Sequence, residues 1–229
     1  MQTNGTITKV IDLSPTAREY TITSDVPFRF HAGAFVNLFV EDHGETIRRA
    51  YSITSSDADE RAFTLSIRHT LGGRLTPLLW QEDFTGRTIK LMGPLGLNTV
   101  DKMQNRKTYL FGFGVGAGVV KSIADAISRR DDQEQLTIIT GSRSIEEILY
   151  KDYFNTLEHD HPNVSVTYVV SDKDQTTYPT GYIQNHLVGL DFNQSDVYVC
   201  GQGVACTALT EAVAATEPQQ CNFFIEDFH

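Results

Sequence analysis

Residues 49–52 read Arg-Ala-Tyr-Ser, and residues 72–76, twenty positions later, read Gly-Gly-Arg-Leu-Thr. The first stretch offers a cation, an aromatic ring and a hydroxyl, and the second offers a glycine-rich turn ahead of an expected helix. Backbone N–H groups at such a turn attract phosphate, as does arginine. Together the two stretches predict a site for a flavin dinucleotide, with Arg49 on the pyrophosphate, Tyr51 against the isoalloxazine ring and Ser52 beside its N5.

The composition describes a globular chain of 229 residues with ten excess acidic charges. That length suits one large domain or two domains of about 100 residues each. The negative charge argues against a nucleic-acid partner, because phosphates need clustered cations. The three cysteines are too few for an iron–sulfur cluster held by four thiolates.

Expectations about location and metal content rest on what the sequence lacks. No apolar run approaches the ~18 residues that span a bilayer, and the first ten residues lack the basic and apolar regions of a secretory signal. A cytoplasmic location without a membrane span is therefore expected. His159-Asp160-His161 precedes Pro162 with no further ligand nearby, so a solvated loop is the preferred interpretation and no metal site is expected.

Charge is divided unevenly along the chain. Residues 1–103 carry 11 lysines and arginines against 12 acidic residues, whereas residues 104–229 carry 8 against 17. The first segment is thus nearly neutral and the second strongly acidic. A change of structural pattern near the polar stretch 99–107 agrees with this shift, so the sequence predicts two domains, 1–103 and 104–229.

Short apolar or alternating runs, separated by turn-forming residues, fill the first domain. Six strands are expected: Gly5–Asp12, Glu19–Ser24, Phe35–Val40, Ala50–Thr54, Phe63–Arg68 and Thr88–Met92. Strands of this length and spacing favour a small antiparallel β-barrel. One helix is expected from about Arg74, since Pro77 is tolerated in a first helical turn.

The second domain alternates strand-like and helical stretches. The expected strands are Thr108–Phe111, Leu136–Thr140, Val164–Val170, Val197–Cys200 and Asn222–Ile225. The expected helices are Gly118–Arg129, Ile145–Leu157, Tyr182–Leu187 and Val204–Ala215. This alternation predicts an α/β domain with a parallel sheet that is covered on both faces.

A third motif, Gly93-Pro94-Leu95-Gly96, follows the two quoted above. In this order and spacing the three resemble the flavin-domain signatures of the ferredoxin–NADP reductase superfamily. The resemblance implies FAD as cofactor, with phosphates on Arg49 and Thr76 and with Ile67 to His69 along the ribityl and adenosine part. The implied FAD-binding residues are Arg49, Ala50, Tyr51, Ser52, Ile67, Arg68, His69, Gly73, Arg74, Leu75 and Thr76.

A glycine-rich loop, residues 111–118, lies between an expected strand and an expected helix, where a pyrophosphate can approach the backbone. No carboxylate follows the next strand to take a ribose 2′-OH, so the loop is not an ordinary Rossmann fingerprint. It resembles the superfamily's nucleotide loop, from which it departs at Val115 and Val119. The resemblance implies that Gly114, Val115, Gly116 and Arg143 bind NADH or NADPH.

Two further segments match the superfamily. Cys200-Gly201 resembles the Cys-Gly motif beside the nicotinamide, and Glu226 and Phe228 resemble its closing Glu-x-aromatic motif. The resemblance makes Ser52, Cys200 and Glu226 the catalytic residues, with Phe228 over the flavin face that nicotinamide enters. A small buried apolar residue is the alternative interpretation of Cys200, and a frayed acidic tail is that of residues 224–229.

The implied function is an oxidoreductase that takes hydride from NADH or NADPH and passes electrons to a one-electron carrier such as ferredoxin or flavodoxin. Two alternatives stay open, a reductase of free flavin and an electron-transfer subunit of a larger complex. Tyr51 and the glycine turn favour bound FAD over free flavin. Arg143 and Lys173 suit a 2′-phosphate whereas Asp172 does not, so both nicotinamide nucleotides are expected to be usable.

Overall fold

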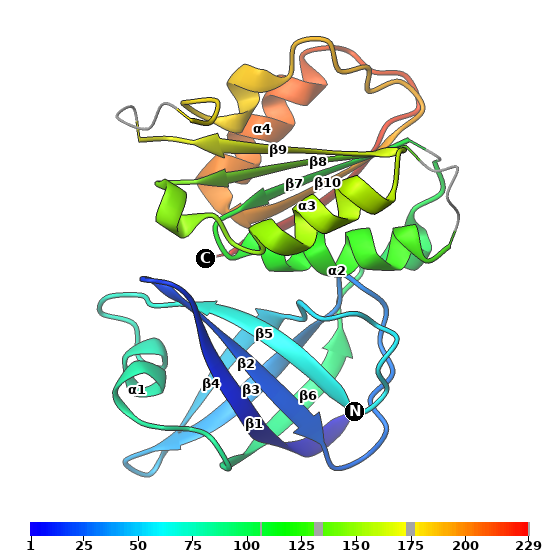
Figure 1. Cartoon of the computed structure of the whole chain (residues 1–229). Coiled ribbons are helices and arrows are strands. Elements are labelled where there is room, and N and C mark those ends of the chain that lie inside the picture. Colours follow the sequence, from blue (N-terminus) through cyan, green and yellow to red (C-terminus); the bar gives the residue numbers. More distant parts are fainter. Residues whose placement is uncertain (106, 131–134, 173–176, 229) are drawn as a thin grey trace.

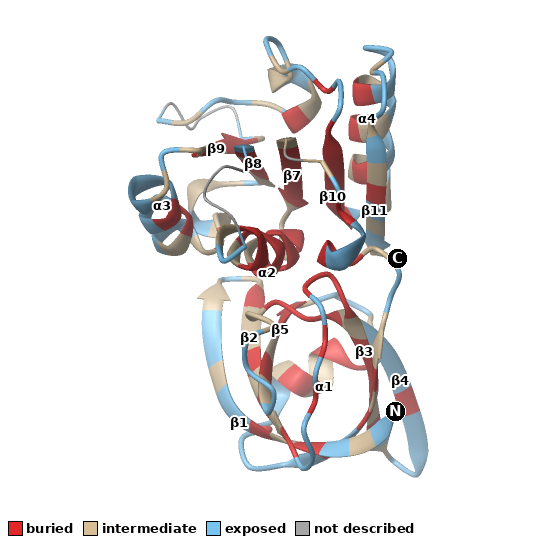
Figure 2. Ribbon diagram, turned by 90° about the vertical axis from the view of Figure 1, so that its right-hand side faces the viewer, coloured by how far each residue is buried: buried red, intermediate tan, exposed pale blue. Residues whose placement is uncertain are grey.

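Two sheets, one antiparallel and one parallel, divide the chain (Figure 1). The computed structural model describes residues 1–105, 107–130, 135–172 and 177–228. The expected two-domain architecture, a β-barrel followed by an α/β domain, is confirmed. Helix α2 (Gly116–Ser128) lies between the parallel sheet and the barrel (Figures 1 and 2).

The barrel has six strands in the order β4-β3-β6-β1-β2-β5. Their bounds are Gln2–Ser14 (β1), Ala17–Ser24 (β2), Phe35–Asp42 (β3), Glu45–Ser52 (β4), Ala62–Arg68 (β5) and Thr88–Leu95 (β6). A bridge between Ile53 and Leu65 joins the two outer strands and closes the barrel. Side chains alternate between a shared apolar interior and the outer surface, as the period of two in the sequence requires.

The fourth strand begins earlier than the sequence predicts. Ala50–Thr54 is expected, but β4 starts at Glu45 and pairs with β3 through the two-residue turn His43-Gly44. Both turn residues have positive φ, at 47° and 82°, which is the backbone of a tight hairpin. The outer face of this strand is so polar that the sequence pattern does not reveal its first half.

The second sheet is parallel, in the order β11-β10-β7-β8-β9. Its strands are Lys107–Phe113 (β7), Gln135–Ser142 (β8), Val164–Val170 (β9), Asp196–Gln202 (β10) and Asn222–Phe228 (β11). Helices α2 and α3 (Lys151–Asp160) pack on one face, and α4 (Gly203–Ala214) packs on the other. Residues 224–228 therefore belong to a strand, not to a frayed tail.

Two expected helices differ in the structure. In place of one helix over Ile145–Leu157, a 3₁₀ turn η2 (Ile145–Glu147) precedes α3, and Tyr150 between them has a φ of 58°. A left-handed residue cannot continue an α-helix. The segment expected as helix Tyr182–Leu187 is the 3₁₀ turn η3 (Ile183–His186). The barrel's helix α1 covers Thr76–Gln81, and no described helix is long and apolar enough to cross a membrane.

The connection between the sheets is held by a buried carboxylate, that of Asp196 on β10. Its oxygens accept hydrogen bonds from the backbone N–H groups of Gln104 (2.6 Å) and Asn105 (2.8 Å). Side-chain amides of Asn105 (2.9 Å) and Asn222 (2.8 Å) donate to it as well. Four donors satisfy a carboxylate that is out of contact with water. The expected boundary after residue 103 falls in this connection, which follows the 3₁₀ turn η1 (Val100–Lys102).

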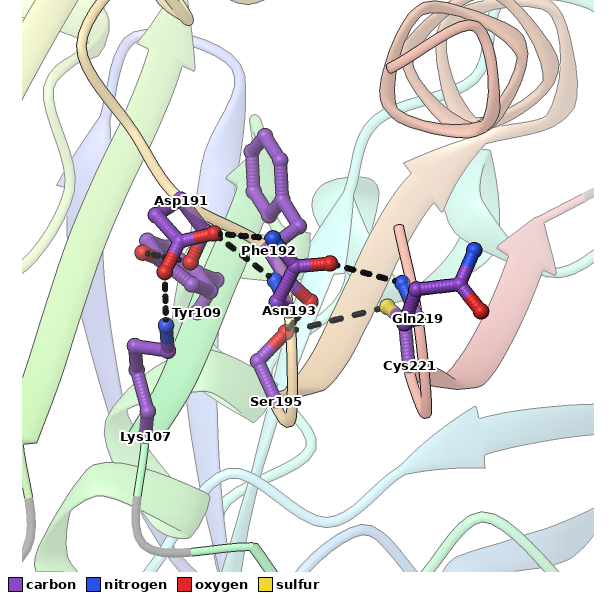
Figure 3. A network of polar contacts seen from close by, with 8 residues as sticks. All are labelled: Lys107, Tyr109, Asp191, Phe192, Asn193, Ser195, Gln219 and Cys221. Carbon is purple, nitrogen blue, oxygen red and sulfur yellow. Dashed lines mark hydrogen bonds and ion pairs between the residues drawn. The ribbon is translucent and has the colours of Figure 1, made fainter. Parts of the chain in front are cut away.

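A second polar network fastens the loop before β10 to its neighbours (Figure 3). The Lys107 ammonium lies 2.7 Å from the carboxylate of Asp191, and the Tyr109 hydroxyl donates to the Asp191 carbonyl at 2.8 Å. Asn193 Oδ1 accepts the backbone N–H of Gln219 at 2.8 Å. These bonds lie at the amino ends of the strands, the end opposite to the glycine-rich loop.

Hydroxyl groups and carboxylates connect the two domains. Glu147 of η2 accepts hydrogen bonds from Ser14 (3.1 Å) and Thr16 (2.8 Å) at the β1–β2 turn. The Tyr150 hydroxyl bonds Glu19 of β2 (2.6 Å) and Ser66 of β5. Small apolar side chains of the barrel also join the core around α2, namely Ala17, Ala32 and Val100. The orientation of the domains is therefore specified at several points.

At one of these points α2 contacts the barrel closely. A Cβ on Gly118 would lie 2.7 Å from Thr54 Cγ2 and 2.8 Å from Ser66 Oγ, so only glycine fits. Next to it, Lys121 Nζ donates to the Thr54 carbonyl (3.3 Å) and Ser122 Oγ donates to the Ser55 carbonyl (2.6 Å). Burial lowers the pKa of Lys121.

Candidate active site

The carboxylate of Glu226 lies where the two domains meet. It belongs to β11, beside Cys200 of β10 in the parallel register. Ser52, the last residue of β4, donates its hydroxyl hydrogen to Oε1, and Tyr198 of β10 donates to Oε2 at 2.6 Å. The structure thus brings the three expected catalytic residues, Ser52, Cys200 and Glu226, to one place and adds Tyr198.

Burial governs the ionisation of this group. Burial raises the pKa of Glu226. The hydrogen bonds from Ser52 and Tyr198 lower this pKa, but by less than burial raises it. Burial also raises the pKa of the fully buried Cys200 thiol well above its usual value, chiefly by desolvation and then by the nearby Glu226 charge. Cys200 is therefore a neutral thiol and no nucleophile.

The glycine-rich loop reaches the same place from α2. A Cβ on Gly116 would lie 2.2 Å from the carbonyl oxygen of Cys200, so the start of α2 can approach β10 only without a side chain. Gly114, at φ 55°, has no atom within 4 Å of its Cβ position and leaves open space above the loop. Val115 precedes the helix and packs half-buried against the core around α2. The loop and the Cys200-Gly201 motif thus lie side by side.

On the barrel side, β4 presents three expected ligand residues. The exposed Arg49 donates from Nη1 to the Arg48 carbonyl (2.7 Å) and forms no ion pair within the described part of the chain. Tyr51 is half-buried against the barrel interior, and burial raises its pKa, so the phenol stays protonated. Ala50 is exposed between them. A free cation next to an aromatic ring fits a pyrophosphate attached to a flat ring system.

The residues expected along the adenosine part differ in what they offer. Ile67 is buried in the barrel interior with only 1% of the whole residue exposed, so neither its side chain nor its backbone is open to solvent. Arg68 is exposed at the end of β5, and His69 stacks on Trp80 with ring centroids 5.0 Å apart. This stack was not anticipated from the sequence, because the two residues lie on different elements.

In the glycine turn before α1, several polar groups form hydrogen bonds with other groups of the same turn. Thr76 Oγ1 donates to the Thr70 carbonyl (3.1 Å) and accepts the Thr70 N–H (3.0 Å), and the Gly73 N–H also bonds Thr70 (3.0 Å). Arg74 forms an ion pair with Glu45, the first residue of β4, and Leu75 is buried. The hydroxyl of Thr76 therefore stabilises the turn in this structure.

At the far end of the site, Arg143 is exposed after β8. Its carbonyl accepts the Asp172 N–H at 2.9 Å, so these two residues of opposite charge lie on adjacent strand ends. Lys173, the other expected cation, lies outside the described residues. Phe228 is half-buried opposite Gln202 and packs against the core that contains Cys200.

Comparison with known proteins agrees with this geometry. The family model of the oxidoreductase FAD-binding domain matches residues 4–99, and that of the oxidoreductase NAD-binding domain matches residues 110–210. The chain belongs to the ferredoxin–NADP reductase superfamily. FAD and a nicotinamide nucleotide are therefore the cofactors of the two domains of this reductase-family chain.

Among relatives of this superfamily member, phenol hydroxylase P5 protein of Acinetobacter pittii is 25% identical over 231 residues, 98% of the chain. Ferredoxin–NADP reductase B of Sorangium cellulosum is 29% identical over 178 residues, 76% of the chain and 72% of the relative. The chain spans 64% of the length of the first of these relatives. Amycolatopsis cytochrome P450 reductase GcoB has the same fold, with a TM-score of 0.89 at 22% identity over 98% of the chain and 69% of that structure.

No motif in the sequence marks Tyr198 as a site residue. The signal that it left was its position two residues before Cys200, which in a strand means the same face of the sheet. The interdomain residues Glu19, Lys121 and Tyr150 left no such signal, because they come from separate elements.

Proposed function

We propose that the chain is an FAD-dependent oxidoreductase that takes hydride from NADH or NADPH and passes electrons to a carrier protein such as ferredoxin or flavodoxin. One observation carries the proposal: Ser52 from the FAD-binding domain and Glu226 from the nucleotide-binding domain share a hydrogen bond across the domain boundary. Such a junction is where a hydride donor and an acceptor held by different domains have to meet.

Bound FAD would supply the redox chemistry, since it takes up two electrons together and releases them singly. The chain's own residues hold the flavin and the nicotinamide nucleotide and orient them toward each other. Arg49 binds the pyrophosphate, Tyr51 packs against the ring system and Ser52 bonds its central edge. Cys200 and Glu226 shape the nicotinamide side, and Phe228 excludes water until the nucleotide enters. Positioning of this kind removes much of the barrier to hydride transfer.

The names of the relatives favour a place in a multi-component system. They include the reductase component of phenol 2-monooxygenase and the electron transfer component of toluate 1,2-dioxygenase, both from Pseudomonas. We infer that the chain likewise delivers electrons to another component of such a system. We also infer that it does so in the cytoplasm. Reduction of free flavin is the second candidate, which the exposed Arg49 and the FAD-binding family match disfavour.

The test is to release the flavin from the purified protein by heat and to follow reduction of the bound flavin by anaerobic stopped flow. We expect FAD on chromatography and reduction by both NADH and NADPH. Cys200→Ala and Glu226→Ala should slow reduction by roughly tenfold or more, the effect of about 1.4 kcal/mol on the barrier, while FAD stays bound.

Cys221→Ala is the matched control, because Cys221 is half-buried at the opposite end of the sheet (Figure 3). It should reduce at the wild-type rate. A colourless protein, or one that releases only FMN, would contradict the proposed function. Wild-type rates in both site variants would return Cys200 and Glu226 to purely structural roles.

A further inference from the structure

Tyr198 lies under the carboxylate of Glu226. Its side chain is fully buried, and its ring stacks on Phe224, with centroids 6.5 Å apart and planes at 15°. Phe224 is its partner in the parallel register, and the next pair on the same face is Cys200 with Glu226. The hydroxyl therefore approaches Glu226 from the interior of the domain and donates to Oε2 at 2.6 Å.

The two oxygens of Glu226 receive donors from opposite sides, Tyr198 from within the domain and Ser52 from the barrel. An ionised carboxylate can only accept hydrogen bonds, and each hydroxyl has a single hydrogen to donate. Both hydrogens point at Glu226. Ser52 thus keeps only lone pairs for whatever lies on its other side.

Among the residues that the structure describes, the groups that face Glu226 do not include a cation. They are Ser52 on β4, Tyr198 and Cys200 on β10 and Cys206 at the start of α4, with Asp227 as the next residue of the strand. Within the described ranges no lysine or arginine forms an ion pair with this carboxylate. Hydrogen bonds from Ser52 and Tyr198 therefore favour the ionised form of this half-buried carboxyl and oppose the effect of burial, which raises its pKa.

We propose that Tyr198 is a positioning residue of the hydride-transfer site: its phenol fixes Glu226 as an acceptor and so makes Ser52 an acceptor toward the flavin. The inference rests on the proposed function, in which Ser52 lies beside flavin N5. An acceptor there suits reduced flavin, whose N5 carries a hydrogen, and does not suit oxidised flavin, whose N5 can only accept. Tyr198 acts on the balance between the two redox states without touching either cofactor.

The first test follows the Glu226 carboxyl itself. In protein labelled with ¹³C at glutamate side chains, with the signal assigned by Glu226→Gln, the carboxyl is titrated by NMR. Tyr198→Phe removes one donor, so the pKa of Glu226 should rise. Tyr109→Phe is the matched control: this buried tyrosine on the adjacent strand β7 donates to Asp191, on the other face of the sheet (Figure 3), and should leave the titration unchanged.

The second test is a redox titration of the FAD-loaded protein against an equilibrating dye. At a given dye ratio, Tyr198→Phe should hold a smaller reduced fraction than the wild type, and Tyr109→Phe should match the wild type. The pH profile of anaerobic flavin reduction should move to higher pH in Tyr198→Phe alone, because its Glu226 gives up its proton at higher pH. If Tyr198→Phe does not fold, replacing Tyr198 by 3-fluorotyrosine makes a stronger donor, and the pKa of Glu226 should then fall.

The outcomes separate this inference from the proposed function. A Glu226 titration and a flavin potential that are both unchanged in Tyr198→Phe would overturn the positioning role. A wild-type protein that binds no FAD, or that neither nicotinamide nucleotide reduces, would overturn the proposed function instead. Even then the carboxyl titration reports whether Tyr198 controls Glu226.

Discussion

At the scale of single residues, Arg49 is an exposed cation that is available to bind a ligand. It is exposed, and within the described part of the chain its side chain donates a hydrogen bond to the neighbouring Arg48 carbonyl. Arg49→Ala should weaken FAD binding by about 1.5–3 kcal/mol, the scale of a hydrogen bond to a charged group. Titration of flavin-free protein with FAD, followed by quenching of the flavin fluorescence, measures this loss.

Arg48→Ala is the control at this scale. Arg48 belongs to the opposite face of β4, where its Nε donates to Asn37 Oδ1 at 3.1 Å. We expect its loss to leave FAD affinity within about 0.5 kcal/mol of the wild type, as is usual for surface positions. Equal losses in the two variants would mean that Arg49 contributes only general positive charge.

The proximity of single residues could be predicted from the sequence where those residues belong to a motif. Ser52, Cys200 and Glu226 were expected together, and the structure does bring them together. Tyr198 could not be singled out, because a tyrosine in the run Val197–Cys200 is equally well explained by burial alone. The hydrogen bonds of Thr76 could not be predicted either. Its hydroxyl bonds the backbone of Thr70 because of the geometry of the turn, which the sequence does not specify.

At the scale of elements, the contact of α2 with the barrel depends on one glycine. Gly118→Ala would place a methyl group 2.7 Å from Thr54 Cγ2 and force the interface to move. Overpacking of this kind costs about 1–3 kcal/mol, which exceeds the roughly 1 kcal/mol that alanine gains in a helix interior. We expect lower stability in urea, with the transition followed by circular dichroism and by flavin fluorescence.

Gly203→Ala serves as the matched substitution, because its Cβ would lie 3.4 Å from the nearest atom, in ordinary contact. It should leave the urea midpoint unchanged or raise it. If Gly118→Ala were as stable as the wild type, the interface at Thr54 would have to be looser than the structure shows.

Helices and strands were predicted correctly where the hydrophobic periodicity is strong. A prediction was wrong where the backbone angle of a single residue ends a helix. The buried strands of the parallel sheet lie where their apolar runs predict. The helix expected over Ile145–Leu157 is divided at Tyr150, whose left-handed backbone allows its hydroxyl to bond Glu19 and Ser66 in the other domain. That choice comes from tertiary contacts, which no local pattern records.

At the scale of the whole molecule, Arg48 and Lys90 of the flavin domain lie together at the surface, whereas three other exposed arginines of this domain form ion pairs. Arg29, Arg74 and Arg87 form ion pairs with Glu60, Glu45 and Glu82. Arg48 and Lys90 instead flank the Phe39 ring on the outer face of the barrel, at 6.0 and 5.9 Å from its centroid. An acidic carrier protein should dock on this surface, because the nucleotide-binding domain carries most of the negative charge and repels it elsewhere.

Arg48→Glu and Lys90→Glu should each slow electron transfer to an acidic ferredoxin by about tenfold at low salt, within the range of electrostatic steering. Added salt should slow the wild type toward the same rate. Arg29→Glu makes the same charge change beside Glu60 and should have a smaller effect, and a neutral quinone acceptor should not distinguish the variants. Carrier rates that ignore both substitutions and salt would exclude an acidic partner at this surface.

The strand orders also bear on how the chain is made. In the barrel, β1 pairs with β6, so that Gln2 lies opposite Met92, and in the parallel sheet β7 pairs with β10, so that Thr108 lies opposite Asp196. At synthesis rates of about 5–20 residues per second, each early strand waits on the order of 5–20 s for its distant partner. During that interval the growing chain exposes unpaired strand edges. We therefore expect its biosynthesis to depend on chaperones that cover such edges, more than that of a protein whose contacts are local.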